Sequence, residues 1–133
     1  MPDLSLNVDD AQFVARLEET PLTNESWGQL AWMIGAKETP GSEQTFGIVT
    51  IHPEQRNPLH SHPNCEELLY VISGECEHLL GDELYRLSAG SVIRIPRGVR
   101  HWARCTSTEP LTAVISFSSP ERQAVNHEGT GKA

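Results

Sequence analysis

The chain has 133 residues, and its 18 Asp and Glu outnumber its 10 Lys and Arg, which gives a formal net charge of −8. This length suits one domain with a hydrophobic core, and the acidic balance argues against nucleic acid or an anionic membrane as a partner. No apolar run approaches the roughly 20 residues of a membrane-spanning helix, and the acidic start of the chain does not resemble a signal peptide. Three irregularly spaced cysteines argue against a disulfide framework. We therefore expect a cytoplasmic protein with reduced thiols.

The first third of the chain predicts one helix and one strand. Residues 7–19 begin with residues that can cap a helix and carry an apolar stripe of Phe13, Val14 and Leu17, so they predict a short N-terminal helix. Residues 27–34 predict a strand, with Trp27 and Trp32 on opposite faces if the strand is regular. Residues 37–43 predict a turn that contains a Pro-Gly pair.

The rest of the chain predicts short strands separated by Gly and Pro turns. The expected strands are 45–51, 67–73, 76–80, 83–87, 91–95, 99–104 and 111–117. Together with the earlier strand they predict an all-β domain, built as a double-sheet jelly roll or barrel. The polar residues from 121 to 133 are expected to be poorly ordered.

Two stretches carry residues with the chemistry of a metal site. His60 and His62 stand two apart on an extended segment, so both imidazoles point to the same side. Glu67 begins the next strand and can add a carboxylate, although Glu66 competes with it, since alternation turns only one of the two inward. His101 follows a Pro-x-Gly turn in the second stretch. Three histidines and one glutamate suit one divalent ion of Mn, Fe, Co, Ni or Zn.

These two stretches resemble the two conserved motifs of the cupin superfamily. The first motif, G-x5-H-x-H-x3,4-E-x6-G, is matched by His60, His62, Glu67 and Gly74. The second, G-x5-P-x-G-x2-H-x3-N, is matched by Gly90, Pro96, Gly98 and His101. Fifteen residues, 75–89, separate the motifs, as in small single-domain bacterial cupins. The resemblance covers residues 44–118 and is specific for fold and metal site, but not for the reaction.

The resemblance implies a double-stranded β-helix, or cupin barrel, at 44–118, with an N-terminal extension of helix and strand at 1–43 and a C-terminal tail at 119–133. It also implies a homodimer and a small-molecule substrate. The most favoured function is a metal-dependent oxygenase of the dioxygenase type that acts on a small oxygenated organic molecule. The alternatives are a non-redox metal-dependent isomerase, lyase or cyclase, or a non-catalytic cupin that binds a small molecule.

The chain departs from the family pattern at two positions. Glu54 stands where the first motif has glycine, and glutamate resists the positive φ that glycine allows. We therefore expect the turn before His60 to be built differently, with Asn57 in the unusual conformation. Cys105 replaces the asparagine of the second motif; it is either a small buried apolar residue or a thiol that supports the metal ligands.

Other side chains are weaker candidates for roles at the site. Aromatic residues can line a pocket or a dimer face, although Tyr70 should point away from the metal; they are Trp27, Trp32, Phe46, Tyr70 and Trp102. Arginines near the motifs can meet an anionic substrate or stay in solvent; they are Arg56, Arg94, Arg97 and Arg100. His52 and His78 have no partner at ligand spacing and are expected to be structural.

Overall fold

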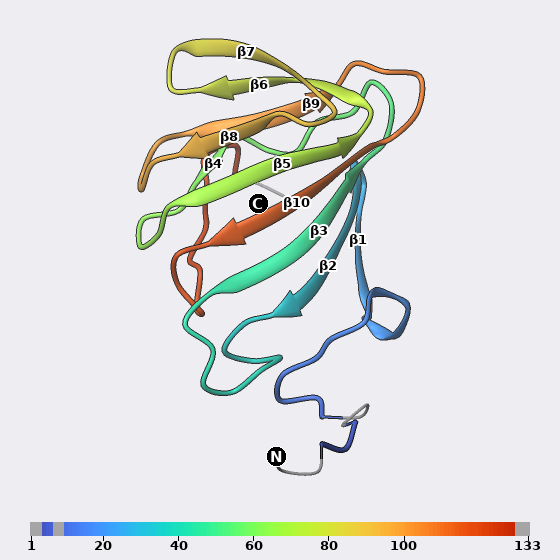
Figure 1. Cartoon of the computed structure of the whole chain (residues 1–133). Coiled ribbons are helices and arrows are strands. Elements are labelled where there is room, and N and C mark those ends of the chain that lie inside the picture. Colours follow the sequence, from blue (N-terminus) through green and yellow to red (C-terminus); the bar gives the residue numbers. More distant parts are fainter. Residues whose placement is uncertain (1–3, 7–9, 130–133) are drawn as a thin grey trace.

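A computed structural model of the chain describes residues 4–6 and 10–129, and its strands form two antiparallel sheets that pack face to face (Figure 1). The six-stranded sheet has the order β1 (Leu22–Glu25), β2 (Gly28–Ile34), β3 (Thr45–Ile51), β10 (Leu111–Phe117), β5 (Glu67–Ser73) and β8 (Val92–Ile95). The five-stranded sheet has the order β11 (Val125–Asn126), β4 (His60–Ser61), β9 (His101–Cys105), β6 (Glu75–Leu80) and β7 (Glu83–Ser88). The predicted all-β double-stranded β-helix is confirmed.

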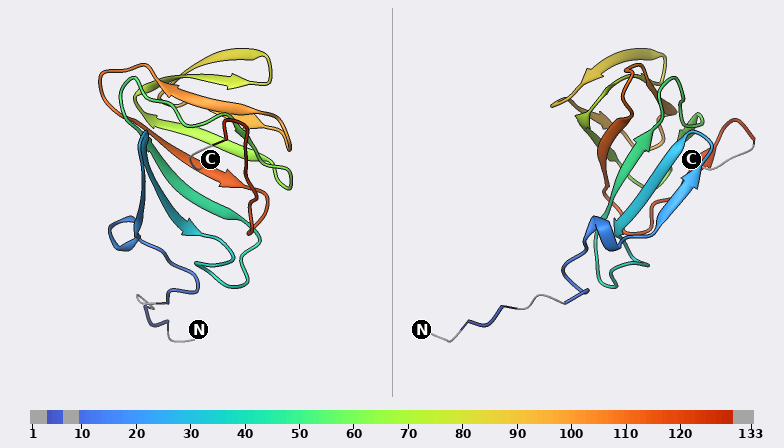
Figure 2. Two further views of the ribbon diagram at one scale, coloured as in Figure 1. Left: turned by 180° about the vertical axis from the view of Figure 1, so that it is seen from behind. Right: turned by 90° about the vertical axis from the view of Figure 1, so that its right-hand side faces the viewer.

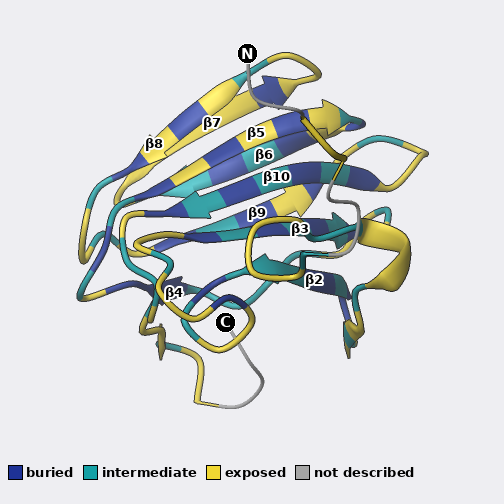
Figure 3. Cartoon of the chain, turned by 60° about the horizontal axis from the view of Figure 1, so that its bottom comes forward, coloured by how far each residue is buried: buried dark blue, intermediate teal, exposed yellow. Residues whose placement is uncertain are grey.

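The core lies between the two sheets because the strands alternate buried and exposed residues. On β5, Leu69 and Val71 are buried while Tyr70 and Ile72 are exposed, and Figure 3 shows this alternation along β5 and β8. Tyr70 therefore points outward, as predicted. The strands of the expected N-terminal extension, β1 and β2, continue the same six-stranded sheet as β3 and β10.

The predicted helix at 7–19 is wrong over its described residues, since the structure has only a 3-10 turn at Leu17–Glu19; residues 7–9 lie outside the described residues. Its apolar stripe has no core to pack against, because Phe13 is 73% exposed and Val14 and Leu17 are also exposed. A helix of this length is marginal in water without such packing. In Figure 2 the described residues 10–16 run away from the sheets. In the described part of the chain, no helix is long and apolar enough to cross a membrane.

The two tryptophans of the predicted strand at 27–34 both reach the interior, instead of lying on opposite faces. The strand begins at Gly28, which leaves Trp27 in the preceding turn, where its carbonyl accepts a hydrogen bond from the backbone N–H of His52 at 3.0 Å. Trp27 is buried in the core, and Trp32 packs against it. Gly28 allows the backbone at the start of β2 to lie close to the backbone of Thr50, since a Cβ at position 28 would lie 1.9 Å from the carbonyl oxygen of Thr50.

The C-terminal segment, defined here as residues 119–129, contradicts the expectation of poor order over its described part. Its strand β11 pairs with β4, so that Val125 lies opposite Ser61 and Asn126 opposite His60. An ion pair of 2.7 Å between Arg56 and Glu128 holds the end of the segment. Residues that look like a solvated tail in the sequence thus attach, by backbone pairing and one ion pair, to the strand that carries His60 and to Arg56 before it.

Glu54 adopts the left-handed conformation, with φ of 68°, and is the one non-glycine residue with positive φ among residues 4–6 and 10–129. The expectation that the turn would be rebuilt around Asn57 is therefore wrong. Two backbone hydrogen bonds with Cys105 hold this conformation. The N–H of Glu54 donates to the carbonyl of Cys105 at 3.1 Å, and the N–H of Cys105 donates to the carbonyl of Gln55 at 2.9 Å. Asn57 instead accepts a hydrogen bond from the backbone N–H of Ala103 at 2.8 Å.

Replacing Glu54 with glycine is expected to raise the free energy of unfolding by about 1 kcal/mol. The substitution removes the strain of the left-handed conformation, and this strain is larger than the extra conformational entropy that a glycine loses on folding. Urea unfolding of the two proteins measures this difference. Gly90→Ala is the matched opposite change, since φ is 91° at Gly90 and a Cβ would meet nothing within 4 Å; it should lower the stability by about 1–2 kcal/mol. A lower stability for Glu54→Gly would contradict the claim that the left-handed conformation of Glu54 is strained.

Candidate metal centre

Four buried side chains, each with a nitrogen or oxygen that can coordinate a metal, meet between the two sheets. Their ligand atoms all lie within 4.8 Å of one another, and the residues are His60, His62, Glu67 and His101. The structure thus brings together all four residues that the sequence selects as metal ligands. Atoms about 2.1 Å from one ion lie roughly 3–4 Å from one another. The distances from Glu67 Oε1 to His62 Nε2 and His101 Nε2, 3.1 and 3.2 Å, fall in this range.

The two sheets contribute opposite sides of the cluster. His60 lies on β4 directly opposite His101 on β9, and His62 follows β4, so the three imidazoles come from the side of the five-stranded sheet. Glu67 opens β5 in the six-stranded sheet, where it pairs with Phe117. The turn that precedes His101 is also tied to the first motif, because Gly98 donates its N–H to the carbonyl of His62 at 2.9 Å.

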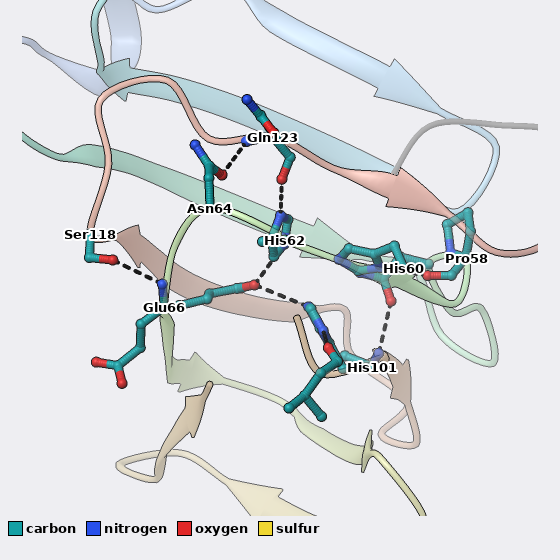
Figure 4. A network of polar contacts seen from close by, with 12 residues as sticks. Pro58, His60, His62, Asn64, Glu66, His101, Ser118 and Gln123 are labelled. Atoms are coloured by element: carbon teal, nitrogen blue, oxygen red, sulfur yellow. Dashed lines mark hydrogen bonds and ion pairs between the residues drawn. The ribbon is translucent and has the colours of Figure 1, made fainter. Parts of the chain in front are cut away.

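Each histidine of the cluster is oriented by a backbone carbonyl at its Nδ1. The Nδ1 atoms of His60, His62 and His101 lie 2.6, 2.8 and 2.9 Å from the carbonyl oxygens of Pro58, Gln123 and Val99, respectively. Carbonyl oxygens only accept hydrogen bonds, so each Nδ1 carries the proton. In the neutral imidazole, Nε2 then presents its lone pair, and second contacts of this kind are typical of histidines that bind metals. Figure 4 shows this network from close by.

The electrostatics of the cluster fit a bound cation. His62 Nε2 is buried without a hydrogen-bond partner, although it lies near Glu67 Oε1. Burial, with a further contribution from the charge of His101, lowers the pKa of His60 to about 3, which keeps it neutral. Burial acts to raise the pKa of Glu67, but the nearby imidazoles of His101 and His62 outweigh it and hold this pKa well below its usual range. A carboxylate and neutral imidazoles that converge in this way repel one another unless a proton or a cation lies between them.

Glu66, the competitor of Glu67, points out of the cavity. Its carboxylate forms an ion pair of 2.9 Å with Arg94, and both side chains are well exposed. Strand alternation therefore selects Glu67, as expected.

The cluster opens into a narrow cavity with mostly apolar walls. About 30 Å³ of it is accessible to the centres of water molecules, which is room for about two waters. Besides three members of the cluster, it is lined by Trp27, Leu30, Trp32, Val49, Ile51, Asn57, Leu69, Ile115, Phe117 and Arg122. Of the predicted aromatic wall residues, Trp27 and Trp32 are present, whereas Phe46, Tyr70 and Trp102 do not line this cavity.

Other sequence candidates do not belong to the cluster. Cys105 is fully buried in the core, where its Sγ lies 3.4 Å from the carbonyl oxygen of Glu109, so it behaves as a small buried residue. Arg56 pairs with Glu128 and lies over the ring of Trp102. His78 is buried and stacks on His101 with 5.8 Å between ring centroids. Burial and the charge of His101 lower the pKa of His78 to about 4, so it packs as a neutral ring.

The sequence-based selection missed the contribution of the C-terminal segment. The carbonyl of Gln123 accepts the Nδ1–H of His62, and Arg122 reaches the cavity wall. Asn64 fastens this part of the segment, because it donates to the carbonyl of Glu121 and accepts from the N–H of Gln123, both at 2.9 Å. These contacts are made mostly by backbone groups, which leave no signature in a polar stretch of sequence.

Comparison with known proteins matches residues 47–117 of the chain to the cupin domain. Germin-like protein 5-1 from Oryza sativa subsp. japonica is 27% identical over 106 residues, which cover 73% of this chain and 48% of that protein. Oxalate oxidase GF-2.8 from Triticum aestivum is 29% identical over 123 residues, 84% of this chain and 54% of that protein. The chain thus spans about half the length of these curated relatives.

Among solved structures, Bacillus subtilis oxalate decarboxylase, a protein with Mn(II) centres, has the same fold. It superposes with a TM-score of 0.78 at 23% sequence identity, over 84% of this chain and 31% of that one. At this identity the likeness shows the fold alone.

Replacing Asn64 with alanine is expected to weaken metal binding roughly 10-fold, because the released C-terminal segment no longer holds the carbonyl of Gln123 against His62. Competition with a chromophoric chelator measures the affinity. Asn24→Ala removes an exposed hydrogen bond on β1, between Asn24 and Gln29, and serves as the control. Equal affinity in wild type and Asn64→Ala would show that the segment does not orient His62.

Proposed function

The chain belongs to the cupin family, and from this premise we propose that it is a metal-dependent enzyme. The observation that carries the proposal is the buried set of convergent acceptor atoms on His60, His62, Glu67 and His101. We propose that these four residues bind one divalent transition metal ion, of Fe, Mn, Zn, Ni or Co.

We propose further that the protein is an oxygenase of the dioxygenase type that acts on a small oxygenated organic molecule. Such an ion, when bound, supplies a Lewis acid and, if it is redox-active, electron transfer with O2. An oxalate oxidase among the relatives supports redox use of this kind of centre. The protein supplies the three Nδ1–H contacts that orient the imidazoles and a largely apolar cavity that limits water near the ion.

The size of the cavity supports a small substrate. Only about 30 Å³ of it is open to the centres of water molecules, so a molecule larger than a few non-hydrogen atoms has to extend beyond the wall formed by Trp32 and Arg122. Beyond that wall lies an open hollow of about 560 Å³, called here the outer pocket.

A second class of function is favoured by the ligand set itself. Three histidines and a carboxylate suit Zn(II) as well as Fe(II), and Zn(II) has no redox chemistry. In that case the same centre supports an isomerase, lyase or cyclase. A small-molecule-binding cupin without catalysis is the remaining alternative.

The first measurement is the metal content, by mass spectrometry, of protein purified without a metal-binding tag. We expect near-stoichiometric iron in the wild type and its loss in Glu67→Ala, because the carboxylate is the one anionic member of the cluster. His52→Ala, which removes an exposed histidine outside the cluster, should retain the metal. A wild type without metal would contradict the proposal and leave a binding protein.

Oxygen uptake by the iron-loaded protein separates the two enzyme classes. With a phenol or a diketone such as pentane-2,4-dione as substrate, we expect O2 consumption that is lost in Glu67→Ala. Turnover that needs no O2 and that Zn(II) alone supports would overturn the oxygenase and favour an isomerase, lyase or cyclase.

We also propose that the protein forms a homodimer through the outer face of the six-stranded sheet. Neighbouring apolar side chains on β5 and β8 remain exposed there: Leu68, Tyr70, Ile72 and Val92. Contiguous exposed apolar surface of this kind marks sites of protein association. Trp27 and Trp32, also considered for this contact, instead pack in the interior.

Ile72→Lys is expected to convert the dimer to a monomer, because it places a charge in this apolar face. Analytical ultracentrifugation at micromolar concentration measures the state. Leu84→Lys is the matched control, since Leu84 is similarly exposed, at 53% against 49% for Ile72, but lies on β7 in the other sheet. A monomeric wild type, or an Ile72→Lys variant that remains a dimer, would contradict dimerisation through this face.

A further inference from the structure

Arg122 places a guanidinium in the wall of the metal cavity. It belongs to the C-terminal segment, is half-buried, and lines the cavity together with His60, His62 and Glu67. Its guanidinium carbon lies 4.1 Å from the ring centroid of Trp32 and 5.3 Å from that of Phe117. The two aromatic rings hold the planar group at the cavity, as stacked arginines are commonly held.

This guanidinium lacks a carboxylate partner. Within residues 4–6 and 10–129, the arginines in ion pairs are Arg56, Arg94 and Arg104, and Arg122 is not among them. Burial lowers the pKa of Arg122, and Glu67 acts against this lowering from a distance, so the group stays charged. A partly buried charge without a partner is unfavourable, which makes the position suited to an anion supplied from outside the chain.

Arg122 also lies between the two hollows near the site. Arg122 and Trp32 line both the metal cavity and the outer pocket, so they form the wall that the two share. The outer pocket carries balanced charge, because Lys37 and Arg122 are offset there by Glu38 and Glu121. In the inner cavity Glu67 is the one carboxylate among the described lining residues, so Arg122 is balanced there only by the carboxylate that would hold the metal ion.

The charges of the inner cavity add up to an excess that an anion can neutralise. With neutral histidines, Glu67 and Arg122 cancel each other, and a divalent ion leaves two positive charges in a largely apolar space. A substrate with a carboxylate compensates this charge, and a guanidinium recognises a carboxylate through two parallel hydrogen bonds.

We propose that Arg122 binds a carboxylate of the substrate at the wall between the metal cavity and the outer pocket. The substrate is then a small carboxylate-bearing molecule whose other oxygen atoms face His60, His62, Glu67 and His101. This inference rests on the proposed metal-dependent function and gives it a substrate class.

Calorimetric titration of the metal-loaded protein with two probes tests the role of Arg122. Malonate and pentane-2,4-dione have the same spacing between their oxygen-bearing carbons, but malonate is a dianion and the diketone is uncharged at neutral pH. Arg122→Gln should weaken malonate binding roughly 10- to 100-fold, which is the usual contribution of a charge-assisted hydrogen bond. Binding of the diketone should change less than about 3-fold, and the metal content should stay at the wild-type level.

Two further variants separate charge from structure. Arg122→Lys keeps the charge without the planar fork and should fall between the other two proteins in malonate affinity. Arg86→Gln removes one exposed positive charge on β7, in the other sheet, and should bind both probes as the wild type does.

The outcomes that overturn the proposal are distinct from those that overturn the metal-dependent function. If the metal-loaded wild type does not bind malonate, or if Arg122→Gln binds it with unchanged affinity, Arg122 is not a carboxylate-binding residue and the metal-dependent function stands. Equal losses for both probes show that Arg122 supports the wall only, and also overturn the proposal. If the wild type takes up no metal, the proposed function fails, and this inference falls with it.

Discussion

The constraint on which the site depends is the direction of three imidazole rings. Each ring is fixed by a carbonyl that accepts its Nδ1–H, so all three Nε2 lone pairs face the same point as the Glu67 carboxylate. Two of these carbonyls, those of Pro58 and Val99, belong to turns two residues before the histidines that they hold, His60 and His101. The third comes from the far end of the chain, which makes the C-terminal segment part of the site. The turns and strands around the cluster thus hold in place a set of groups that repel one another when no cation is present.

Alternation together with motif spacing selected the cluster from the sequence. Period-2 alternation places His60 and His62 on one side and turns only one of Glu66 and Glu67 inward, whereas the spacing to Gly74 in the first motif prefers Glu67, and the structure agrees at these positions. The predicted strands at 45–51 and 111–117 have the bounds of β3 and β10, because each is a short β-branched run between turns. Alternation is a property of neighbouring residues, so it can be read without knowledge of the rest of the fold.

The failures share a cause, which is that long-range contacts decided the outcome. The apolar stripe at Phe13 satisfies the local pattern of a helix but finds no surface to pack on. The polar residues after 119 look like a tail, yet backbone pairing with β4 orders those that the structure describes. Glu54 takes a conformation that its own side chain disfavours, because the backbone hydrogen bonds of Glu54 and Gln55 with Cys105 hold it. Arg122 belongs to the same group, since its place at the cavity depends on a segment whose order the sequence conceals.

The division of the cluster between the two sheets has a mechanical consequence. The chain's three cysteines are all free, so no disulfide ties one sheet to the other. An ion held by Glu67 from one side and by His60, His62 and His101 from the other acts as a cross-link that closes the loops between residues 60 and 101. If the unfolded chain keeps the ion, this cross-link lowers the entropy of the unfolded state. If the unfolded chain releases the ion, binding to the folded state alone stabilises that state by mass action. In either case a bound ion would stabilise the contact between the two sheets, so the supply of metal would affect how stable the folded barrel is.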